Sequence, residues 1–329
     1  MAEWEQFRAQ HSAGGTDQGA AYGATKDVAD AFRRRAFRSA VIAEWASTNP
    51  AAALAYLLEK DRGQAAQLMR EWLRIDPEAA IDGVLAAGEK ARGQLRILAR
   101  DIARLAPSRL AEVVSAMPKS SNRWDTTAQD AFAIYAEKDP EAARAAAESV
   151  KGAMRSQALA GIARAWGETD GPAALAWAEK LSPGEERDMA LKAGLIGWAK
   201  RDPVGALGRI DAVPPGGDEM YHASDAGAQV LREAAKHDWD ATMKWLQDNP
   251  GKLGRTSLDG LQSALSQRLM SDVRGTLNSI ASGNVPGLAM VLGNSLLNDG
   301  YPQHAAVWKW LEEHPSNSFT QGLRSSVVN

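Results

Sequence analysis

Large apolar side chains recur along this chain in a pattern that repeats about every 31–32 residues. In each copy a large side chain lies five positions before a proline or its substitute, and another lies six positions after it, as in Trp45, Pro50 and Tyr56. The proline positions of the successive copies are residues 50, 77, 107, 140, 171, 203, 239, about 271 and 302. A period of this length, filled only with helical spacing, is typical of stacked helix pairs.

Each copy also carries the signals of one helix ending and another beginning. Leu191, Leu195 and Trp198 are spaced by four and three residues, which indicates one face of a helix. Asp202 can then cap the next helix, and Pro203 suits its first position because that position needs no backbone N–H donor. Each unit is therefore predicted to contain a longer helix of about 15 residues and a shorter one of about 10.

These patterns predict an all-α fold, because no segment shows the two-residue alternation of a strand. We expect a right-handed α-solenoid of about nine helix pairs that forms a single domain over residues 30–329, with one further helix within 315–329. Residues 1–29 are expected to be a flexible N-terminal leader, because residues 11–25 are rich in glycine, alanine and polar side chains.

The amino-acid composition makes several functional classes less favoured for this protein. The chain has 38 basic and 41 acidic residues and a net charge of −3, which does not favour nucleic acid as a partner. It has no cysteine, so disulfides and thiol nucleophiles are excluded. Membrane insertion is not expected, because no apolar run reaches about 18 residues. The known motifs of hydrolases, phosphate loops and dinucleotide sites are absent, so no enzymatic activity, cofactor or metal site is predicted.

The first residues of the chain bear on the cellular compartment of the protein. The first twenty residues contain charged side chains and no apolar core of signal-peptide length, which predicts a cytoplasmic protein for the sequence as written. The alternative is a periplasmic or exported protein, if Met1 begins a mature fragment.

The chain has 11 tryptophans, and most of them coincide with the repeat. Those at the two repeat positions are interpreted as core residues, because large and small side chains alternate between facing helices: Trp45, Trp72, Trp166, Trp177, Trp198, Trp245 and Trp308. The tryptophans outside these positions are candidates for exposed contacts: Trp4, Trp124, Trp239 and Trp310.

An arginine also recurs, about ten to twelve residues before each repeat aromatic. The members of this series are Arg34, Arg62, Arg92, Arg123, Arg155, Arg187 and Arg255. The structural interpretation is that each side chain packs on the preceding unit and bonds the last carbonyls of its short helix. The functional alternative is a row of guanidinium groups for acidic side chains or phosphates.

Three places are candidates for partner binding. The densest positive cluster can be a solvated helix face or can steer an acidic partner, and it comprises Arg33, Arg34, Arg35 and Arg38. The longest repeat spacing contains an insertion at residues 214–222 whose Tyr221 and His222 can contact a partner, since loops often carry function. Trp124 is the third candidate.

The motif from Trp198 to Pro203, with Ala-Lys-Arg-Asp between them, resembles tetratricopeptide-like and HEAT-like α-solenoids. It is also similar to bacterial proteins built from tandem Trp-x4-Asp-Pro helical repeats. The resemblance covers residue 30 to the end, and it departs from the tetratricopeptide pattern, in which Gly and Tyr follow the Trp. It implies a non-enzymatic scaffold that holds a protein or peptide partner on its concave face.

Two other functions stay open at this point. One is a HEAT-like enzyme that acts on nucleic acid, in which tryptophan and arginine would line a concave groove. The other is a helical scaffold domain of a larger cell-wall enzyme.

The core interpretation of the repeat tryptophans is testable at Trp198. Its replacement by alanine is expected to lower the free energy of unfolding by roughly 3 to 5 kcal/mol, as large-to-small core changes do. Chemical denaturation of both proteins measures the difference. An unchanged stability would instead indicate a surface residue.

Overall fold

The computed structural model describes residues 2–11, 17–122, 125–213, 226–250, 252, 258–281, 285, 287–297 and 304–328. These residues form helices and connecting turns, with no strand among them, so the prediction of an all-α protein is confirmed. The chain divides into two compact units, Met1–Gly161 and Ile162–Asn329. This division lies within a helix and differs from the predicted boundary at residue 30.

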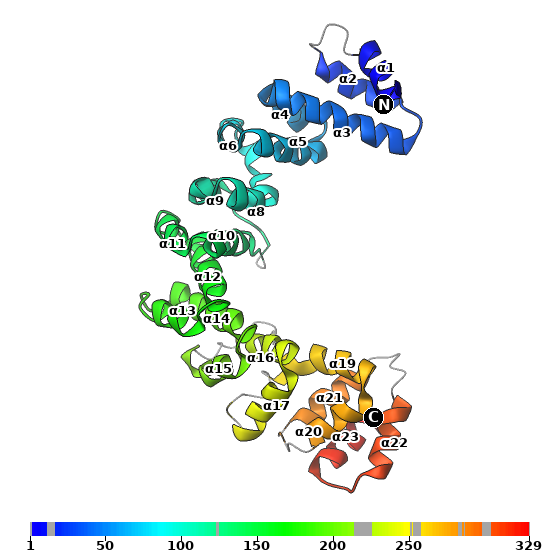
Figure 1. Ribbon diagram of the computed structural model, residues 1–329, viewed down its shortest axis with the longest axis vertical. Helices are drawn as coiled ribbons and strands as arrows, with labels where there is room; N and C mark the ends of the chain where they lie inside the picture. Colours follow the sequence, from blue (N-terminus) through cyan, green and yellow to red (C-terminus); the bar gives the residue numbers. More distant parts are fainter. Residues whose placement is uncertain are drawn as a thin grey trace. The chain divides into compact units, whose positions relative to one another are not determined.

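In the first unit, long helices follow one another with shorter helices between them (Figure 1). Along the chain the elements are α1 (Ala2–His11), α2 (Gln18–Ala24), η1 (Thr25–Asp27), α3 (Ala31–Thr48), α4 (Pro50–Lys60), α5 (Arg62–Ile75), α6 (Pro77–Ala86), α7 (Glu89–Arg92), α8 (Leu95–Leu105), η2 (Pro107–Arg109), α9 (Leu110–Ala116), α10 (Thr127–Lys138), α11 (Pro140–Glu148) and α12 (Ala153–Gly167), which crosses the boundary. The long helix α3 packs against α5, α5 against α8, and α8 against α10.

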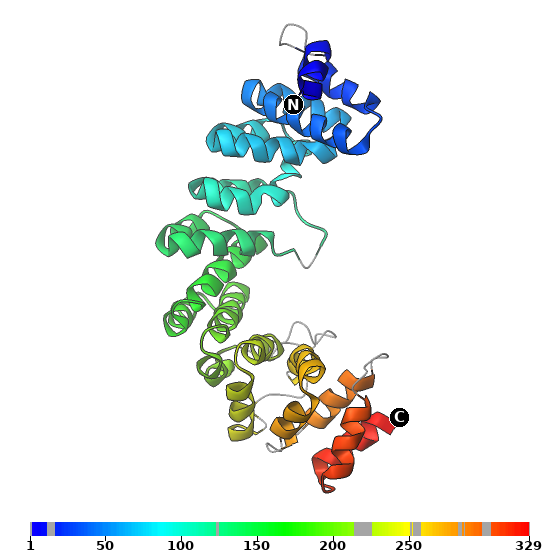
Figure 2. The same cartoon turned by 45° about the vertical axis from the view of Figure 1, so that its right-hand side comes forward.

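The second unit is drawn from green to red in Figure 2, and most of its helices pack in two layers. Its elements are α13 (Gly171–Ala178), α14 (Glu185–Ala199), α15 (Pro203–Gly208), η3 (Ile210–Ala212), α16 (Ala226–His237), α17 (Trp239–Asp248), η5 (Asp259–Leu261), α19 (Gln262–Ser271), α20 (Val273–Ala281), α21 (Leu288–Leu297), α22 (His304–Glu313) and α23 (Ser318–Val328). In one layer α14, α16, α19, α21 and α23 pack in sequence, and in the other α15, α17, α20 and α22 do so. The helix expected within 315–329 is present as α23.

The short helices begin where the capping signals predict. At eight of these starts an Asp or Asn side-chain oxygen accepts a hydrogen bond from the backbone N–H three residues later, at 2.8 to 3.2 Å. This bond is formed by Asp17, Asn49, Asp76, Asp139, Asp170, Asp202, Asp238 and Asp272. The start at Pro107 follows Ala106 and has no side-chain capping bond. Asp17 lies about one period before Asn49, so α2 occupies the place of one more short helix.

The first residues of the chain differ from the flexible leader that was expected over 1–29. They form α1, α2 and η1, and α2 packs against both α1 and α3. Tyr22 is only 1% exposed and Phe7 is also buried. With only seven residues, two of them glycine, α2 has a weak intrinsic tendency to form a helix, and the burial of Tyr22 against α3 and α4 supplies the missing stability. Residues 12–16 of the expected leader lie outside the described residues.

Successive long helices touch each other through glycine. A Cβ atom on Gly197 of α14 would overlap the carbonyl oxygen of Arg164 in α12, and a Cβ on Gly167 would overlap that of Gly194. In the first unit a Cβ on Gly161 would likewise overlap the backbone of α10 at Gln129. Only glycine permits such backbone contact, so these positions set the distance between neighbouring long helices.

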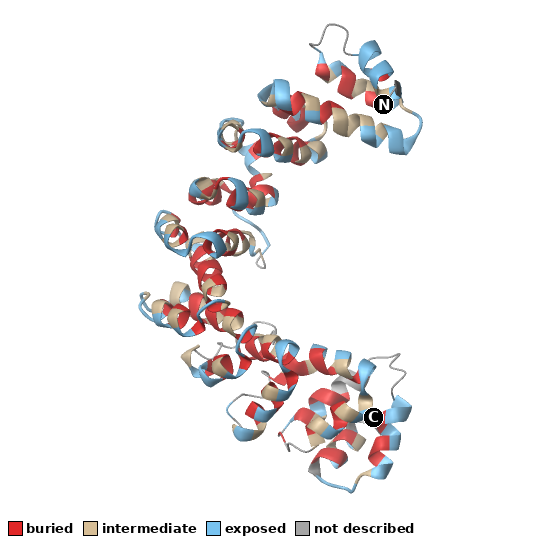
Figure 3. Ribbon diagram, in the orientation of Figure 1, coloured by how far each residue is buried: buried red, intermediate tan, exposed pale blue. Residues whose placement is uncertain are grey.

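Buried residues run along the helices of both units (Figure 3), and most of the repeat tryptophans are buried or half-buried. Trp45, Trp72 and Trp245 are buried, which confirms their prediction as core residues. The half-buried ring of Trp198 lies directly over Gly171, at the start of α13, and over Gly205 in α15. The rings of Trp166 and Trp177 are half-buried and lie 5.8 Å apart. These positions therefore act in packing between adjacent helix pairs.

The prediction was wrong at three tryptophans. Trp308, assigned to the core, is 37% exposed, whereas Trp310 is 2% exposed and Trp239 is also buried. The helix α22 begins at His304, two residues after Pro302, so the sixth position after the helix start is Trp310. Trp4 is half-buried and contacts the rings of Phe7 and Phe37. Trp124 lies outside the described residues.

The backbone contact at Gly197 gives a direct test of helix packing. Gly197→Ala is expected to reduce the free energy of unfolding by about 2 to 3 kcal/mol, because overpacking forces α12 and α14 apart. Gly208→Ala serves as a matched control, since nothing lies within 4 Å of the added Cβ. Chemical denaturation followed by circular dichroism measures both. A comparable loss in the two variants would contradict the proposed close approach.

Candidate functional site

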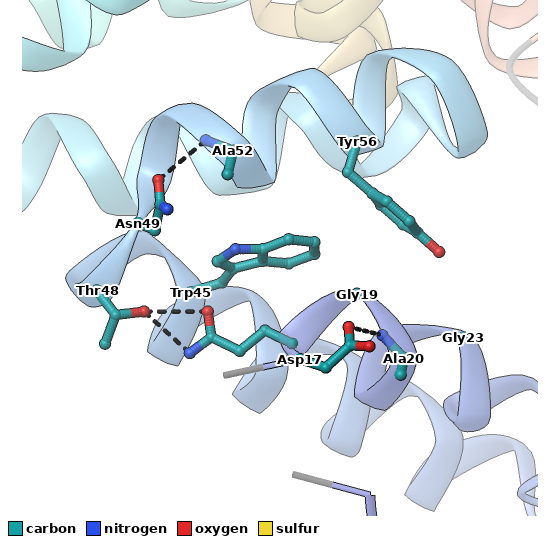
Figure 4. Close-up of a pocket in the computed structure, with 10 residues that line it drawn as sticks. Asp17, Gly19, Ala20, Gly23, Trp45, Thr48, Asn49, Ala52 and Tyr56 are labelled. Carbon is teal, nitrogen blue, oxygen red and sulfur yellow. Dashed lines mark hydrogen bonds between the residues drawn. The ribbon is translucent and has the colours of Figure 1, made fainter. Parts of the chain in front are cut away.

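A cleft of about 750 Å³ lies in the first unit, where the start of α2 faces the end of α3 and the start of α4 (Figure 4). It is lined by Asp17, Gln18, Gly19, Ala20, Gly23, Trp45, Thr48, Asn49, Ala52 and Tyr56. The sequence analysis missed this site because it assigned residues 17–23 to a leader and the two aromatic residues to the core. The available signal was the position of Asp17, about one period before Asn49.

Two aromatic side chains form the apolar part of the cleft. The ring centroids of Trp45 and Tyr56 are 5.3 Å apart, and the ring planes meet at 50°. Trp45 is buried and Tyr56 is half-buried. Tyr56 also contacts the buried Tyr22 edge-on at 6.0 Å, which supports its ring from behind. The two lining rings therefore present an angled apolar corner to the cleft.

Polar groups line the opposite side. The Gln18 amide nitrogen donates to Thr48 Oγ1 at 2.9 Å, and Thr48 Oγ1 lies 3.0 Å from both Gln18 Oε1 and the Glu44 carbonyl oxygen. Asp17 Oδ1 accepts a hydrogen bond from Ala20 N at 2.8 Å. Asp17 is the only Asp, Glu, Lys, Arg or His among the lining residues. The cleft thus combines two rings, a fixed amide–hydroxyl pair and one carboxylate.

Gly19 is the point at which these groups converge. A Cβ atom built there would lie 3.5 Å from Asp17 Oδ1, 3.4 Å from Tyr56 Cε2 and 3.5 Å from Trp45 Cη2. Because glycine has no side chain, the space between the carboxylate and the two rings stays open.

A polar network holds α2 in place behind the cleft. The Tyr22 hydroxyl donates to Asp61 Oδ2 at 2.7 Å, and Arg38 Nη1 lies 3.8 Å from the same oxygen. The Arg38 guanidinium lies over the Tyr22 ring at 5.4 Å. Burial and the hydrogen bond to Asp61 raise the pKa of Tyr22, so its hydroxyl keeps its proton at neutral pH. These contacts fix one wall of the cleft.

The four arginines of the predicted cluster have different surroundings. Arg33 pairs with Glu3 of α1 at 3.1 Å, Arg34 donates to the Val28 and Ala29 carbonyls, and Arg38 belongs to the Tyr22 network. Arg35 is exposed and makes no ion pair with any residue that the structure describes. Three of the four side chains thus contact groups in the first helices or the turn before α3, and their role in partner binding stays a prediction. The other candidates, Trp124, Tyr221 and His222, lie outside the described residues.

The structural interpretation of the arginine series is confirmed where hydrogen bonds are seen. Arg62 Nε donates to the Leu58 carbonyl of α4 at 3.1 Å. Arg155 Nη1 donates to the Ala147 carbonyl of α11 at 2.9 Å. Each therefore bonds the end of the preceding short helix, whose last carbonyls lack partners within the helix.

A second recurring basic position links neighbouring helix pairs, and it was not predicted from the sequence. Lys138 and Arg201 each lie two residues before a junction proline. Lys138 Nζ donates to the carbonyl of Arg104, and Arg201 Nη1 donates to that of Thr169, both at 2.9 Å. These bonds tie the end of one long helix to the end of the preceding one.

Within the described part of the chain, no group of three His, Cys, Asp or Glu side chains is placed to hold a metal ion. No described helix has both the length and the apolar character needed to span a membrane. Comparisons with protein-family models, curated proteins and solved structures found no match.

The Tyr22–Asp61 bond is expected to stabilise the first unit. Tyr22→Phe removes the hydroxyl and should lower the free energy of unfolding by about 1 to 2 kcal/mol, because Asp61 loses a partly buried donor. Tyr135→Phe is the control, since that tyrosine is also buried but donates no hydrogen bond to another described residue. Denaturation at neutral pH measures both, and equal losses would show that the bond contributes nothing.

Proposed function

We propose that this protein is a non-enzymatic helical-repeat scaffold, a solenoid of about nine helix pairs, that binds a peptide segment of a partner protein. The recurring capping bond and the pairwise packing of successive long helices within each unit support the solenoid. The aromatic cleft beside Gly19 supports peptide binding, and it is the observation on which the proposal depends.

The size and lining of the cleft suit a peptide side chain. Ligand sites typically have volumes of about 300 to 1,000 Å³ and combine apolar walls with a few polar groups. Here the rings of Trp45 and Tyr56 provide the apolar walls, and Gln18 and Thr48 provide amide and hydroxyl groups at one edge. A side chain of an extended peptide can enter such a cleft while its backbone remains outside.

The same lining supports binding over catalysis. Nucleophilic catalysis needs a nucleophile next to a general base. The Thr48 hydroxyl lies against the Glu44 carbonyl and the Gln18 amide, and the lining contains no His, Lys or Cys. It contains no Arg either, so it offers no cation for a phosphate, which favours a peptide over a nucleic acid.

Peptide selection on the whole chain tests the proposal. A random peptide library is selected against three immobilised proteins: the wild type, Gly19→Leu and Gly63→Leu. Leucine at position 19 should fill the cleft without clashes at its Cβ, because the nearest atoms lie at ordinary contact distance. Position 63 is exposed on α5 and outside the cleft, so it controls for the added side chain.

We expect peptides enriched on the wild type to be retained by Gly63→Leu and to lose at least about 90% of their binding to Gly19→Leu, as when a pocket is occluded. Equal binding of the selected peptides to Gly19→Leu, or no enrichment on the wild type, would refute peptide binding in the cleft.

A further inference from the structure

The charge in the cleft is negative and has no neutralising partner among the lining residues. Asp17 contributes the carboxylate, and only its Oδ1 atom is used in the capping bond to Ala20 N. Two arginines of the same unit are engaged elsewhere: Arg8 pairs with Glu44 at 2.8 Å, and Arg38 with Asp61 and the Tyr22 ring. The second oxygen of Asp17 makes no hydrogen bond to a described residue. It can therefore accept one from a ligand.

The aromatic corner adds a second attraction for positive charge. The faces of tryptophan and tyrosine carry partial negative charge and attract ammonium and guanidinium groups. The ring centroids of Trp45 and Tyr56 are 5.3 Å apart and the planes meet at 50°, so a group placed beside Gly19 lies next to both rings. Neutral apolar side chains also pack on such rings, which leaves the carboxylate as the feature that distinguishes a cation from a neutral group.

The Asp17 carboxylate and the two aromatic rings lie close together at Gly19. Asp17 Oδ1, Tyr56 Cε2 and Trp45 Cη2 all lie within 3.5 Å of the point that a Cβ atom would occupy there. Figure 4 shows Asp17 and the two rings on opposite sides of this point. The apolar stem of a lysine or arginine can lie along the rings while its charged end reaches the carboxylate.

An acidic side chain fits this site poorly. The start of α2 already has an anion, because Asp17 accepts the bond from Ala20 N. A second carboxylate would stand next to the Asp17 carboxylate, and the two like charges would repel each other. The cleft is thus selective against the acidic partner that the arginine cluster suggested from the sequence.

We propose that the cleft recognises a basic side chain, lysine or arginine, of a bound peptide, with Asp17 as the residue that determines this specificity. This inference rests on the proposed function and specifies the chemistry of the partner.

The test uses the full chain labelled with 5-fluorotryptophan and followed by fluorine NMR. The Trp45 signal is assigned by its loss in Trp45→Phe. Four probes are titrated: the N-acetyl amides of lysine, arginine, norleucine and glutamate. Norleucine has an apolar side chain similar in shape to the lysine stem and carries no charge, so it isolates the contribution of the cation.

The decisive variant is Asp17→Asn. Asparagine caps a helix about as well as aspartate, so α2 is retained while the charge is removed. The control is Asp76→Asn, which makes the same change at a capping residue outside the cleft. Circular dichroism confirms that both variants fold.

We expect the lysine and arginine amides to shift the Trp45 signal saturably, with the norleucine and glutamate amides binding at least about threefold more weakly. Asp17→Asn should weaken lysine binding by about three- to tenfold, whereas Asp76→Asn should not change it. Norleucine binding should be the same in all three proteins. Equal binding of lysine and norleucine, no effect of Asp17→Asn, or a Trp45 signal that none of the probes moves would each overturn the inference.

This result is distinguishable from a failure of the proposed function. Selected peptides that require an open position 19 but contain no basic residue would refute the inference and leave peptide binding intact. Binding of the lysine amide without any selected peptide would refute peptide binding and leave the charge preference intact.

Discussion

The hydrogen bond from a capping Asp or Asn to the backbone three residues later fixes where most of the short helices begin. It recurs eight times from Asp17 to Asp272, at 2.8 to 3.2 Å, and the short helix that starts at Pro107 lacks it. Several of these residues precede a proline, which prevents the earlier helix from continuing across the junction. The long and short helices therefore meet at a constant offset. All contacts between neighbouring pairs depend on that offset, because it determines which residues face each other one period apart.

The second constraint is the distance between long helices. Gly167 and Gly197 allow backbone contact between α12 and α14, and Gly161 allows it between α10 and α12. Large rings then fill the space that this approach leaves at the helix ends, as Trp198 does over Gly171 and Gly205. The pairing of glycine with tryptophan lets neighbouring helices approach closely while a large ring fills the adjacent space.

The cleft arises where the same capping and glycine–tryptophan packing occur in the first copy of the repeat. At Trp198 the preceding short helix presents Gly171 directly beneath the ring. At Trp45 the preceding short helix is α2, whose Gly19 stands at contact distance from the edge of the ring and beside the Asp17 carboxylate. A position that elsewhere serves packing thus becomes open to a ligand. The Tyr22 network holds α2 there, so the opening is part of the folded unit.

The sequence by itself determined the all-α character, the starts of the short helices and the buried positions of Trp45, Trp72 and Trp245. These features depend on signals within a few residues: helical spacing, an Asp or Asn cap, and a proline after it. The tertiary structure decided the rest. The burial of Trp310 instead of Trp308 depends on which face of α22, His304–Glu313, packs against its neighbours.

The difference between local signals and tertiary contacts also explains why the helices at the start of the chain and the cleft were not predicted. The composition of α2 is typical of a flexible segment, and only its contacts with α3 and α4, about one period away, make it a helix with a buried tyrosine. The arginines of α3 look like a docking surface until Glu3, the Val28 carbonyl and Tyr22 are placed against them. The cleft joins residues from three helices. No local sequence pattern predicts that these residues lie together, because their proximity depends on packing between neighbouring helix pairs.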